Sequence, residues 1–226
     1  MRKNVKQQLA LRVLSTAALM AMVSSIATAA FADTYDLTKG SVEIVAKDGI
    51  QSITQRDDTG AFVKDEKGEN IDNRQDDDIT LTTKNKDTGE TTTTGETATT
   101  GETATTGEIK TTHNAITIDA EKGNTAKVTL DNVNIDVYGS SKAALTVTGD
   151  GNTEIELNGD NTLISGRGHA GLEKADYGSH GSLTITDDLN NNGSKKEEGQ
   201  PGDVGSLNVV GKGGGAGIGG RKGSYD

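Results

Sequence analysis

The sequence predicts an all-β chain that folds as a right-handed parallel β-helix with coils of about 27 residues. The first supporting observation is composition: of 226 residues, 31% are hydrophobic, 3% are aromatic, 30 are glycine and one is proline. Such a chain lacks the side chains for a thick core but suits short strands joined by tight turns. The other two observations are an internal repeat and a hydrophobic alternation that changes phase at corners. Together they predict a thin core of stacked aliphatic side chains.

The repeat is clearest in the second half of the chain, where Val128 and Leu130 recur as Ile155 and Leu157, 27 residues later. The other pairs with this spacing are Ile118 and Leu145, Val137 and Ile164, Gly139 and Gly166, Ala143 and Ala170, and Leu145 and Leu172. The turn Gly123-Asn124-Thr125 returns 28 residues later as Gly151-Asn152-Thr153, and the run at Gly181–Ile185 returns more weakly 24 residues later at Gly205–Val209. Self-similarity at a nearly fixed period is typical of stacked structural units.

The alternation indicates what each unit is. Val128 and Leu130 have even numbers, but after Asp131-Asn132 the apolar residues Val133, Ile135 and Val137 have odd numbers. Because alternate residues of a strand share a face, this change of phase predicts a corner after which a new strand begins. Three strands and three corners in about 27 residues describe one coil. An antiparallel β-sandwich explains the strand lengths equally well but not the common register.

Residues 1–32 predict a signal peptide. Arg2 and Lys3 open the chain, an apolar stretch follows, and Ala30-Phe31-Ala32 supplies the small residues of a cleavage site before Asp33. The alternative, an uncleaved membrane anchor, is disfavoured by the short, Ala- and Ser-rich apolar run. Cleavage would change the net charge from −11 to −15, because four basic and no acidic residues are lost. No second apolar span follows, so we expect a secreted chain without a transmembrane segment.

The mature chain divides into three predicted regions. Residues 33–83 are predicted to form N-terminal strands or a cap. Residues 84–110 are predicted to form a Thr/Gly/Glu-rich low-complexity loop built on a six-residue repeat. Residues 111–226 contain the predicted coils, with a Gly-rich end at 211–220. Since a bare solenoid end would expose edge strands, we also expect the natural protein to continue beyond Asp226.

Composition excludes several classes of function. An acidic chain gains nothing from counterion release, so nucleic acid is not an expected partner. The absence of cysteine excludes disulfides, thiolate metal sites and a cysteine nucleophile. His113, His169 and His180 fall in predicted turns and corners, where a polar surface role explains them better than catalysis does.

The sharpest candidate site is a calcium loop. Asp188, Asn190 and Asn192 match the opening of an EF-hand loop, in which alternate oxygen ligands surround a turn at Gly193. The closing ligand fits less well, because Glu198 is the eleventh residue rather than the twelfth, and Lys195 stands at the usual aliphatic position. A polar insertion explains the same residues, so Ca²⁺ is a weak candidate and no cofactor is expected to be required. Sugars stack on aromatic rings, and the aromatic residues of the mature chain are Tyr35, Phe62, Tyr138, Tyr177 and Tyr225.

Several segments resemble a known family. They are Asn124–Ile135, Gly151–Thr162, His169–Lys174, Ser182–Ile185 and Gly215–Gly220. These runs are similar to secreted bacterial carbohydrate-binding-domain proteins with a pectate-lyase-like β-helix, common among surface and secreted proteins of gut-type Firmicutes. The resemblance covers roughly residues 111–220 and implies sugar binding or adhesion, often with calcium, and no catalysis.

The sequence therefore predicts a secreted or cell-surface, non-enzymatic β-solenoid that binds extracellular polysaccharide or cell-wall glycan. No residue can be assigned to the glycan site from the sequence. A negative chain favours neutral glycans or contacts bridged by cations. Two alternatives stay open: a fragment of a polysaccharide lyase or hydrolase, and a purely structural surface spacer.

Overall fold

The computed structural model describes residues 33–84, 108–174, 180–189 and 204–220. The chain divides into two compact units, Met1–Phe31 and Ala32–Asp226, and the described residues belong to the second. The predicted signal peptide and most of the Thr/Gly/Glu-rich loop lie outside the described residues, so they stay predictions.

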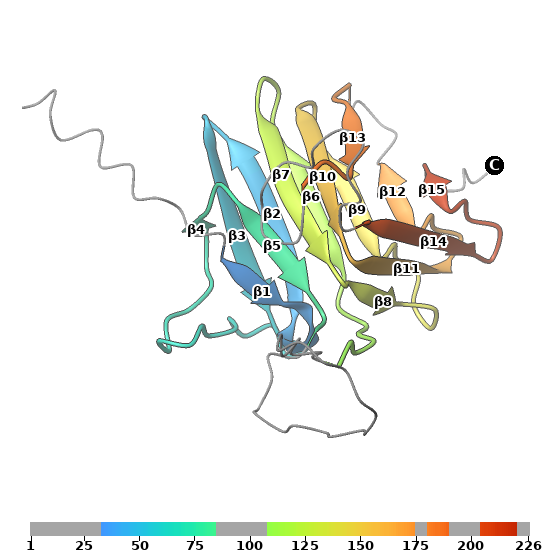
Figure 1. The fold of residues 1–226 in the computed structure, drawn as a ribbon, viewed down its shortest axis with the longest axis horizontal. Helices are drawn as coiled ribbons and strands as arrows, with labels where there is room; N and C mark the ends of the chain where they lie inside the picture. Colours follow the sequence, from blue (N-terminus) through green and yellow to red (C-terminus); the bar gives the residue numbers. More distant parts are fainter. Residues whose placement is uncertain (1–32, 85–107, 175–179, 190–203, 221–226) are drawn as a thin grey trace, which may run out of the picture. The chain divides into compact units, whose positions relative to one another are not determined.

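The described residues form strands and one short 3₁₀ turn (Figure 1). The elements are β1 (Thr34–Asp36), η1 (Leu37–Lys39), β2 (Ser41–Lys47), β3 (Ile50–Arg56), β4 (Arg74–Gln75), β5 (Ile79–Thr82), β6 (Ile116–Ala120), β7 (Thr125–Asp131), β8 (Asn134–Asp136), β9 (Leu145–Thr148), β10 (Asn152–Asn158), β11 (Asp160–Arg167), β12 (Leu172–Lys174), β13 (Leu183–Thr186), β14 (Ser206–Lys212) and β15 (Ile218–Gly219). The predicted all-β class is confirmed for this part of the chain.

The strands build three sheets. Sheet 1 has the order β1-β5-β7-β10-β13, sheet 2 the order β8-β11-β14, and sheet 3 the order β4-β3-β2-β6-β9-β12-β15. Pairing is parallel throughout, except where β3 pairs antiparallel with β2 and with β4. From β7 onward the chain visits sheets 1, 2 and 3 in that order three times, ending with β13, β14 and β15. Each visit adds one layer to all three sheets.

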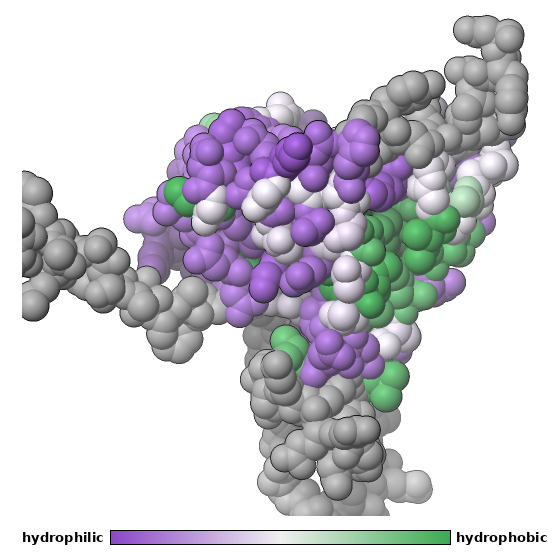
Figure 2. Space-filling model, turned by 90° about the horizontal axis from the view of Figure 1, so that it is seen from above, coloured by the Kyte–Doolittle hydropathy of each residue, from purple (hydrophilic) through white to green (hydrophobic). Residues whose placement is uncertain are grey.

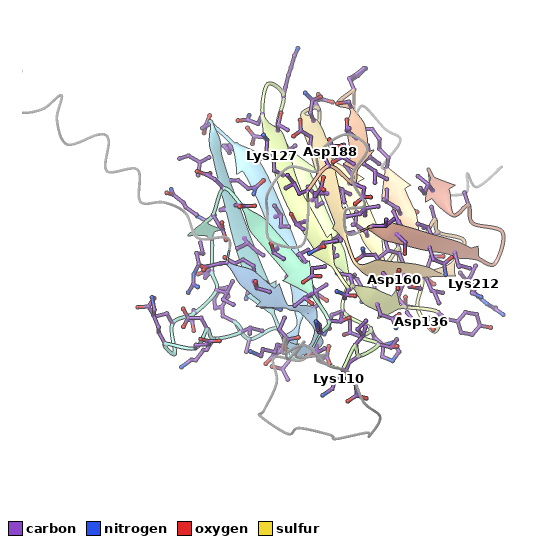
Figure 3. The ribbon with its side chains drawn as sticks, viewed as in Figure 1. Lys110, Lys127, Asp136, Asp160, Asp188 and Lys212 are labelled. Atoms are coloured by element: carbon purple, nitrogen blue, oxygen red, sulfur yellow. The ribbon has the colours of Figure 1, made fainter. Side chains whose placement is uncertain are left out.

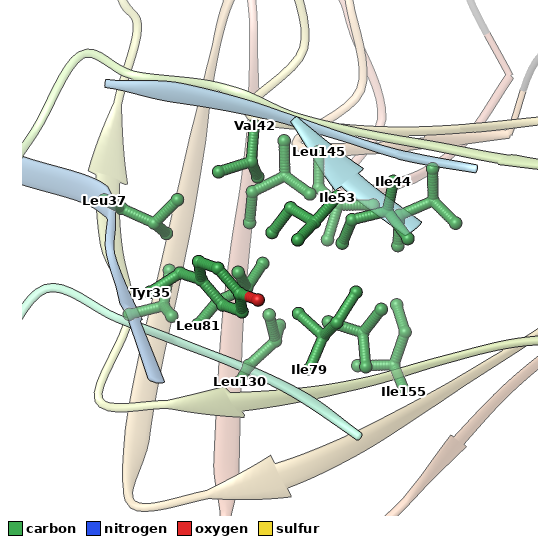
Figure 4. Close-up of a cluster of buried hydrophobic side chains, with 14 of the residues drawn as sticks. Tyr35, Leu37, Val42, Ile44, Ile53, Ile79, Leu81, Leu130, Leu145 and Ile155 are labelled. Carbon is green, nitrogen blue, oxygen red and sulfur yellow. The ribbon is translucent and has the colours of Figure 1, made fainter. Parts of the chain in front are cut away.

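Parallel pairing aligns aliphatic side chains into rows that cross the layers. One row in sheet 1 consists of Ile79, Val128, Ile155 and Ile185. One row in sheet 3 consists of Val42, Ile116, Leu145, Leu172 and Ile218. Rows from different sheets meet inside the molecule, as the labelled side chains of Figure 4 show, and most of these side chains are fully buried. This arrangement provides a continuous core without large side chains.

The predicted register is confirmed in part. Val128 lies opposite Ile155, Leu130 opposite Leu157, and Leu145 opposite Leu172, all 27 residues apart. In sheet 2, however, Ile164 lies opposite Asp136 instead of Val137, because three residues separate Asn158 from Thr162, whereas two separate their partners Asp131 and Asn134.

Three other predicted equivalences are wrong. Leu145 pairs with Ile116 and not with Ile118. The two Gly-Asn-Thr turns align with a spacing of 27 rather than 28, since Asn152 lies opposite Thr125. The 24-residue copy fails for a different reason: Leu183 belongs to sheet 1 and Leu207 to sheet 2. Two strands with the same alternation look alike in sequence whichever sheet they join.

Strand β3 covers one end of the stacked layers. Gln51, Ile53 and Gln55 alternate along it and share a buried face. The Gln51 amide donates to the carbonyl oxygens of Asp76 and Lys127, both at 3.0 Å, and accepts from the Lys127 amide at 2.6 Å.

The second glutamine acts in the same way. The Gln55 amide donates to the carbonyl oxygens of Asp36 at 2.8 Å and Gly40 at 3.0 Å. These buried amides tie β3 to backbone groups that a further parallel strand would otherwise pair. The N-terminal strands therefore share the sheets of the later layers and close one end of them.

Two long insertions leave the layers at the same corner, between sheet 1 and sheet 2. One separates β5 from Thr112, which bridges to Ile135 of β8, and the other separates β13 from β14. In the two layers between them, the corner is a tight turn at Asn132 or Gly159, both with positive φ. The side chains of Thr83 and Asn161 bond to backbone groups at this corner and fix its shape.

A pair of glycine substitutions tests this packing. At Gly166 of β11, an added Cβ atom would lie 2.1 Å from the Ser140 carbonyl oxygen, whereas nothing lies within 4 Å at Gly139. We expect Gly166→Ala to lower the free energy of unfolding by about 1–3 kcal/mol because the backbone must move. Gly139→Ala is the matched control, with an expected change within about 0.5 kcal/mol. Chemical denaturation measures both, and equal effects would contradict the layer geometry.

Candidate functional site

A polar cleft of about 390 Å³ lies beside the end that β3 covers. It is lined by β1, the end of η1, residues of β3, β4 and β5, and the segment that joins β3 to β4. Its lining residues are Asp33, Thr34, Tyr35, Asp36, Lys39, Gln55, Val63, Lys64, Asp65, Glu66, Lys67, Ile71, Arg74, Thr82 and Lys84. The volume falls within the range of small-molecule pockets, about 300–1,000 Å³.

The segment between β3 and β4 is built from a short repeat that our sequence reading missed. Asp57-Asp58-Thr59-Gly60 recurs eight residues later as Asp65-Glu66-Lys67-Gly68, and Val63 recurs as Ile71. In each copy the aspartate side chain accepts from backbone amides two and four residues ahead. The eight-residue spacing is the signal that would have found this wall of the cleft.

The two copies stack on β3 through their backbones. Val63 donates to the Gln55 carbonyl, Ile71 donates to that of Val63, and Gln55 donates to that of Ile71. Val63 and Ile71 are buried and attach the wall to the core. Lys64, Asp65, Glu66 and Lys67, around the second aspartate, thereby line the cleft.

Tyr35 of the cleft lining is buried and pairs with Asp76, which does not itself line the cleft. The Tyr35 hydroxyl donates to Asp76 Oδ2 at 2.9 Å, and the Asp78 amide donates to Asp76 Oδ1 at 3.0 Å. Burial raises the pKa of Asp76, while both hydrogen bonds oppose that rise. Burial and the neighbouring carboxylate also raise the pKa of Tyr35, so its hydroxyl remains a donor.

The charges of the cleft differ from those of the whole chain. Five basic and four acidic side chains line it, whereas the chain carries a net charge of −11. Arg74 and Asp65 form an ion pair at 2.8 Å, with side chains about one-fifth exposed. The Glu69 amide and Arg74 hold the pKa of Asp65 below its usual range. The cleft therefore offers several amine and guanidinium donors in an otherwise negative protein.

The aromatic residues that the structure describes do not gather in one place. Tyr35 is buried, and the Arg56 guanidinium lies over the Phe62 ring at 3.8 Å from its centroid. Tyr138 is 57% exposed at a corner, with the Lys212 ammonium 5.9 Å from its ring centroid. Tyr177 and Tyr225 lie outside the described residues.

The histidines occupy separate layers. His113 contacts the Asp136 carbonyl oxygen, and His180 lies 3.4 Å from an Asp150 carboxylate oxygen on the surface. His169 Nδ1 lies 2.8 Å from Glu173, and both side chains are mostly buried. The nearby Ser165 hydroxyl donates to the backbone carbonyl oxygens of Gly166 and His169 and not to the imidazole. This geometry stabilises a corner and does not form a Ser-His-acid triad.

The calcium candidate is only partly described. Asp188 is exposed just after β13 (Figure 3), whereas Asn190, Asn192 and Glu198 lie outside the described residues. In the described ranges, no group of three or more His, Asp or Glu side chains is placed to hold a metal ion. The Ca²⁺ prediction therefore stays a prediction.

Comparison with known proteins adds no assignment. No family model, no curated protein and no solved structure matches this chain significantly. Among the residues that the structure describes, no helix is long and apolar enough to cross a membrane.

The Tyr35–Asp76 pair makes a pH-dependent prediction. Because the folded-state pKa of Asp76 is raised, protonation favours the folded state, and the stability that this provides is lost as pH rises through that pKa. The Tyr35→Phe substitution removes a hydrogen-bond donor to the ionised Asp76 carboxylate. We expect this substitution to lower the free energy of unfolding by about 1–3 kcal/mol at neutral pH, and by less as pH falls and Asp76 becomes protonated.

Asp76→Asn is the matched control, since the amide keeps an oxygen acceptor but carries no charge. We expect this variant to lose the pH dependence of Asp76. Thermal or urea denaturation across acidic and neutral pH measures both variants. A Tyr35→Phe effect that is independent of pH would show that the hydroxyl does not stabilise the carboxylate.

Proposed function

We propose that this chain is a secreted, non-enzymatic, right-handed parallel β-solenoid that binds carbohydrate at or beyond a bacterial cell surface, and that the cleft is its binding site. The polar cleft beside the covered end carries the proposal. It is concave, rich in charged and hydroxyl side chains, and backed by buried residues that hold it in shape. A hydroxyl-rich ligand needs many such donors and acceptors.

Support for the solenoid comes from the order in which strands enter the sheets. Three successive visits to sheets 1, 2 and 3, with parallel pairing between layers, are the strand order expected of a chain that winds around one axis. Connections between parallel strands of one sheet are right-handed in about 98% of cases. Secretion is supported by the signal-peptide pattern of residues 1–32.

The acidic groups favour binding over hydrolysis. A glycosidase needs a carboxyl group with a raised pKa that can reach the glycosidic oxygen. Asp65, in the cleft lining, has a lowered pKa and is paired with Arg74. Asp76 has a raised pKa, but it is 8% exposed and both of its oxygens accept hydrogen bonds within the protein.

A glycan array with the chain that starts at Asp33 tests the proposal. We expect retention on neutral oligosaccharides, with acidic glycans as a second arm because the cleft is richer in cations than the chain as a whole. Lys39→Ala with Lys84→Ala should raise the dissociation constant of the best ligand by at least about tenfold. Ca²⁺ and a chelator form a further arm, which tests the Asp188 loop.

The matched control removes two lysines elsewhere, Lys122→Ala with Lys127→Ala. It should bind as the parent does. Binding to no glycan would favour the structural spacer, and release of sugar or unsaturated uronate products would establish the enzyme alternative. Equal loss in both double variants would place the site outside the cleft.

A further inference from the structure

The predicted cleavage site adjoins the cleft. Asp33, which would be the first residue of the mature chain, is one of the residues that line the cleft. Cleavage replaces the neutral amide between Ala32 and Asp33 with a free α-amino group. Such a group has an ordinary pKa of about 8, so at neutral pH it is mostly a cation. Removal of the signal peptide would therefore change the charge of the cleft itself.

Asp33 is held in place, unlike most chain termini. Its carbonyl oxygen accepts from the Thr80 amide at 3.1 Å, in the ladder that joins β1 to β5. Two residues later, the Tyr35 side chain is 3% exposed and its hydroxyl bonds to Asp76. The α-nitrogen of Asp33 is two covalent bonds from the carbonyl carbon that this ladder fixes. A charge on this nitrogen therefore has a defined position beside the cleft.

The carboxylates of the lining do not need this cation as a partner. Asp65 pairs with Arg74 at 2.8 Å, and Asp36 accepts from the amide and the hydroxyl of Thr38 at 2.9 and 2.6 Å. With the α-ammonium group of Asp33 added to the five basic side chains, six cations face four acidic side chains. Polarity alone does not distinguish the cleft, because hydrophilic residues cover much of the face that Figure 2 shows. Its excess of cations does, in a chain with a net charge of −11.

We propose that the α-ammonium group of Asp33 is a binding group of the cleft and holds an oxyanion of an acidic glycan. An ammonium group offers three donors and a full charge, which suit a carboxylate or a phosphate. A neutral glycan presents no such group and gains little from this cation. The role rests on the proposed secretion and on the proposed cleft, and it adds the feature that selects acidic ligands.

The uncleaved chain lacks this binding group. Before cleavage the nitrogen of Asp33 belongs to a peptide bond, which carries no charge and offers a single donor. Signal-peptide removal thus couples export to recognition, because an acidic ligand meets the complete set of cations only in the mature chain.

Selective acetylation of the α-amine tests the proposal on the chain that starts at Asp33. At a pH of about 6.5 the α-amine reacts in preference to lysines, whose ordinary pKa is about 10.4. Mass spectrometry confirms that one acetyl group has been added, and peptide mapping confirms its place. The probes are a glucan tetrasaccharide in three forms: neutral, oxidised to glucuronates at C6, and phosphorylated at C6. The last two forms distinguish a carboxylate from a phosphate ligand.

We expect acetylation to raise the dissociation constant of at least one acidic form by about three- to fivefold, the scale of a partly exposed ion pair. Added salt should reduce this difference. The neutral form should change by less than about twofold. A chain that starts at Ala32 is the matched control, since it keeps the charge but moves it by one residue, about 3.8 Å between Cα atoms. It should also bind the acidic forms more weakly than the parent, and equal affinities of all three chains would overturn the proposal.

The pKa of Asp76 gives a readout that needs no ligand. Electrostatic interactions connect Asp33 with Asp76, Tyr35 and Arg74. Because a nearby cation favours the ionised carboxylate, acetylation should raise the pKa of Asp76, measured from its carboxyl NMR signal. The other charged or titratable groups around it are the same in both chains: Tyr35, Asp36, Lys39, Lys64, Asp65, Glu66, Lys67, Arg74 and Lys84 of the lining, and Asp78. An unchanged pKa would place the α-ammonium group elsewhere and overturn its role.

This role and the proposed cleft can fail separately. If the neutral form binds and acetylation affects no acidic form, the cleft proposal stands and the role of the terminus is overturned. Binding of none of the three forms to either chain would overturn both for these glycans. The intact mass of the protein exported from the full-length gene tests the cleavage itself. A mass reduced by residues 1–32 supports the role, whereas a cut elsewhere or a retained leader would overturn it.

Discussion

Parallel backbone pairing in one repeated register is the constraint on which the rest of the structure depends. It places Val128 over Ile79 and under Ile155, so that each aliphatic side chain is covered by its counterparts in the neighbouring layers. A chain with 3% aromatic residues can therefore bury a continuous core. The same constraint makes the first and last layers special, because each has a neighbour on one side only. β3 covers the first layer with buried amides, and the last layer keeps partly exposed aliphatic residues.

Much of the fold could be predicted from local patterns. Low aromatic content, a 27-residue repeat and phase changes at Asp131-Asn132 led to parallel strands in which Val128 correctly pairs with Ile155 and Leu145 with Leu172. The errors arose where corners differ in length. One extra residue between paired positions after β10 moved Ile164 opposite Asp136. The long insertion between β13 and β14 gave Leu207 nearly the spacing of a full coil from Leu183, although the two residues lie in different sheets of the same layer. Alternation gives the face of a strand, but corner length decides its partner.

The candidate site was much less predictable. Gln51 and Gln55 are polar, so the sequence predicts that they occupy exposed strand positions. Their burial is favourable only because they bond to backbone groups, which belong to Asp36, Gly40, Asp76 and Lys127. The Tyr35–Asp76 pair joins residues 41 positions apart, and no local pattern links them. The eight-residue repeat that contains Asp57 and Asp65 would have predicted the cleft wall. Its position against β1 depended on long-range contacts that the sequence does not encode locally.

The corner between sheets 1 and 2 also has a consequence for how such a gene can change. Both long insertions leave the layers there, while Asn132 and Gly159 pass the same corner in a tight turn. Because the flanking strands keep their partners whatever lies between them, replication slippage in the six-residue tract can add or remove copies without moving a single core residue. In a flexible loop, each doubling of length costs only about 0.6 kcal/mol in closure entropy. Alleles with different copy numbers can therefore share one framework, and the corner can accept foreign peptides in engineered display.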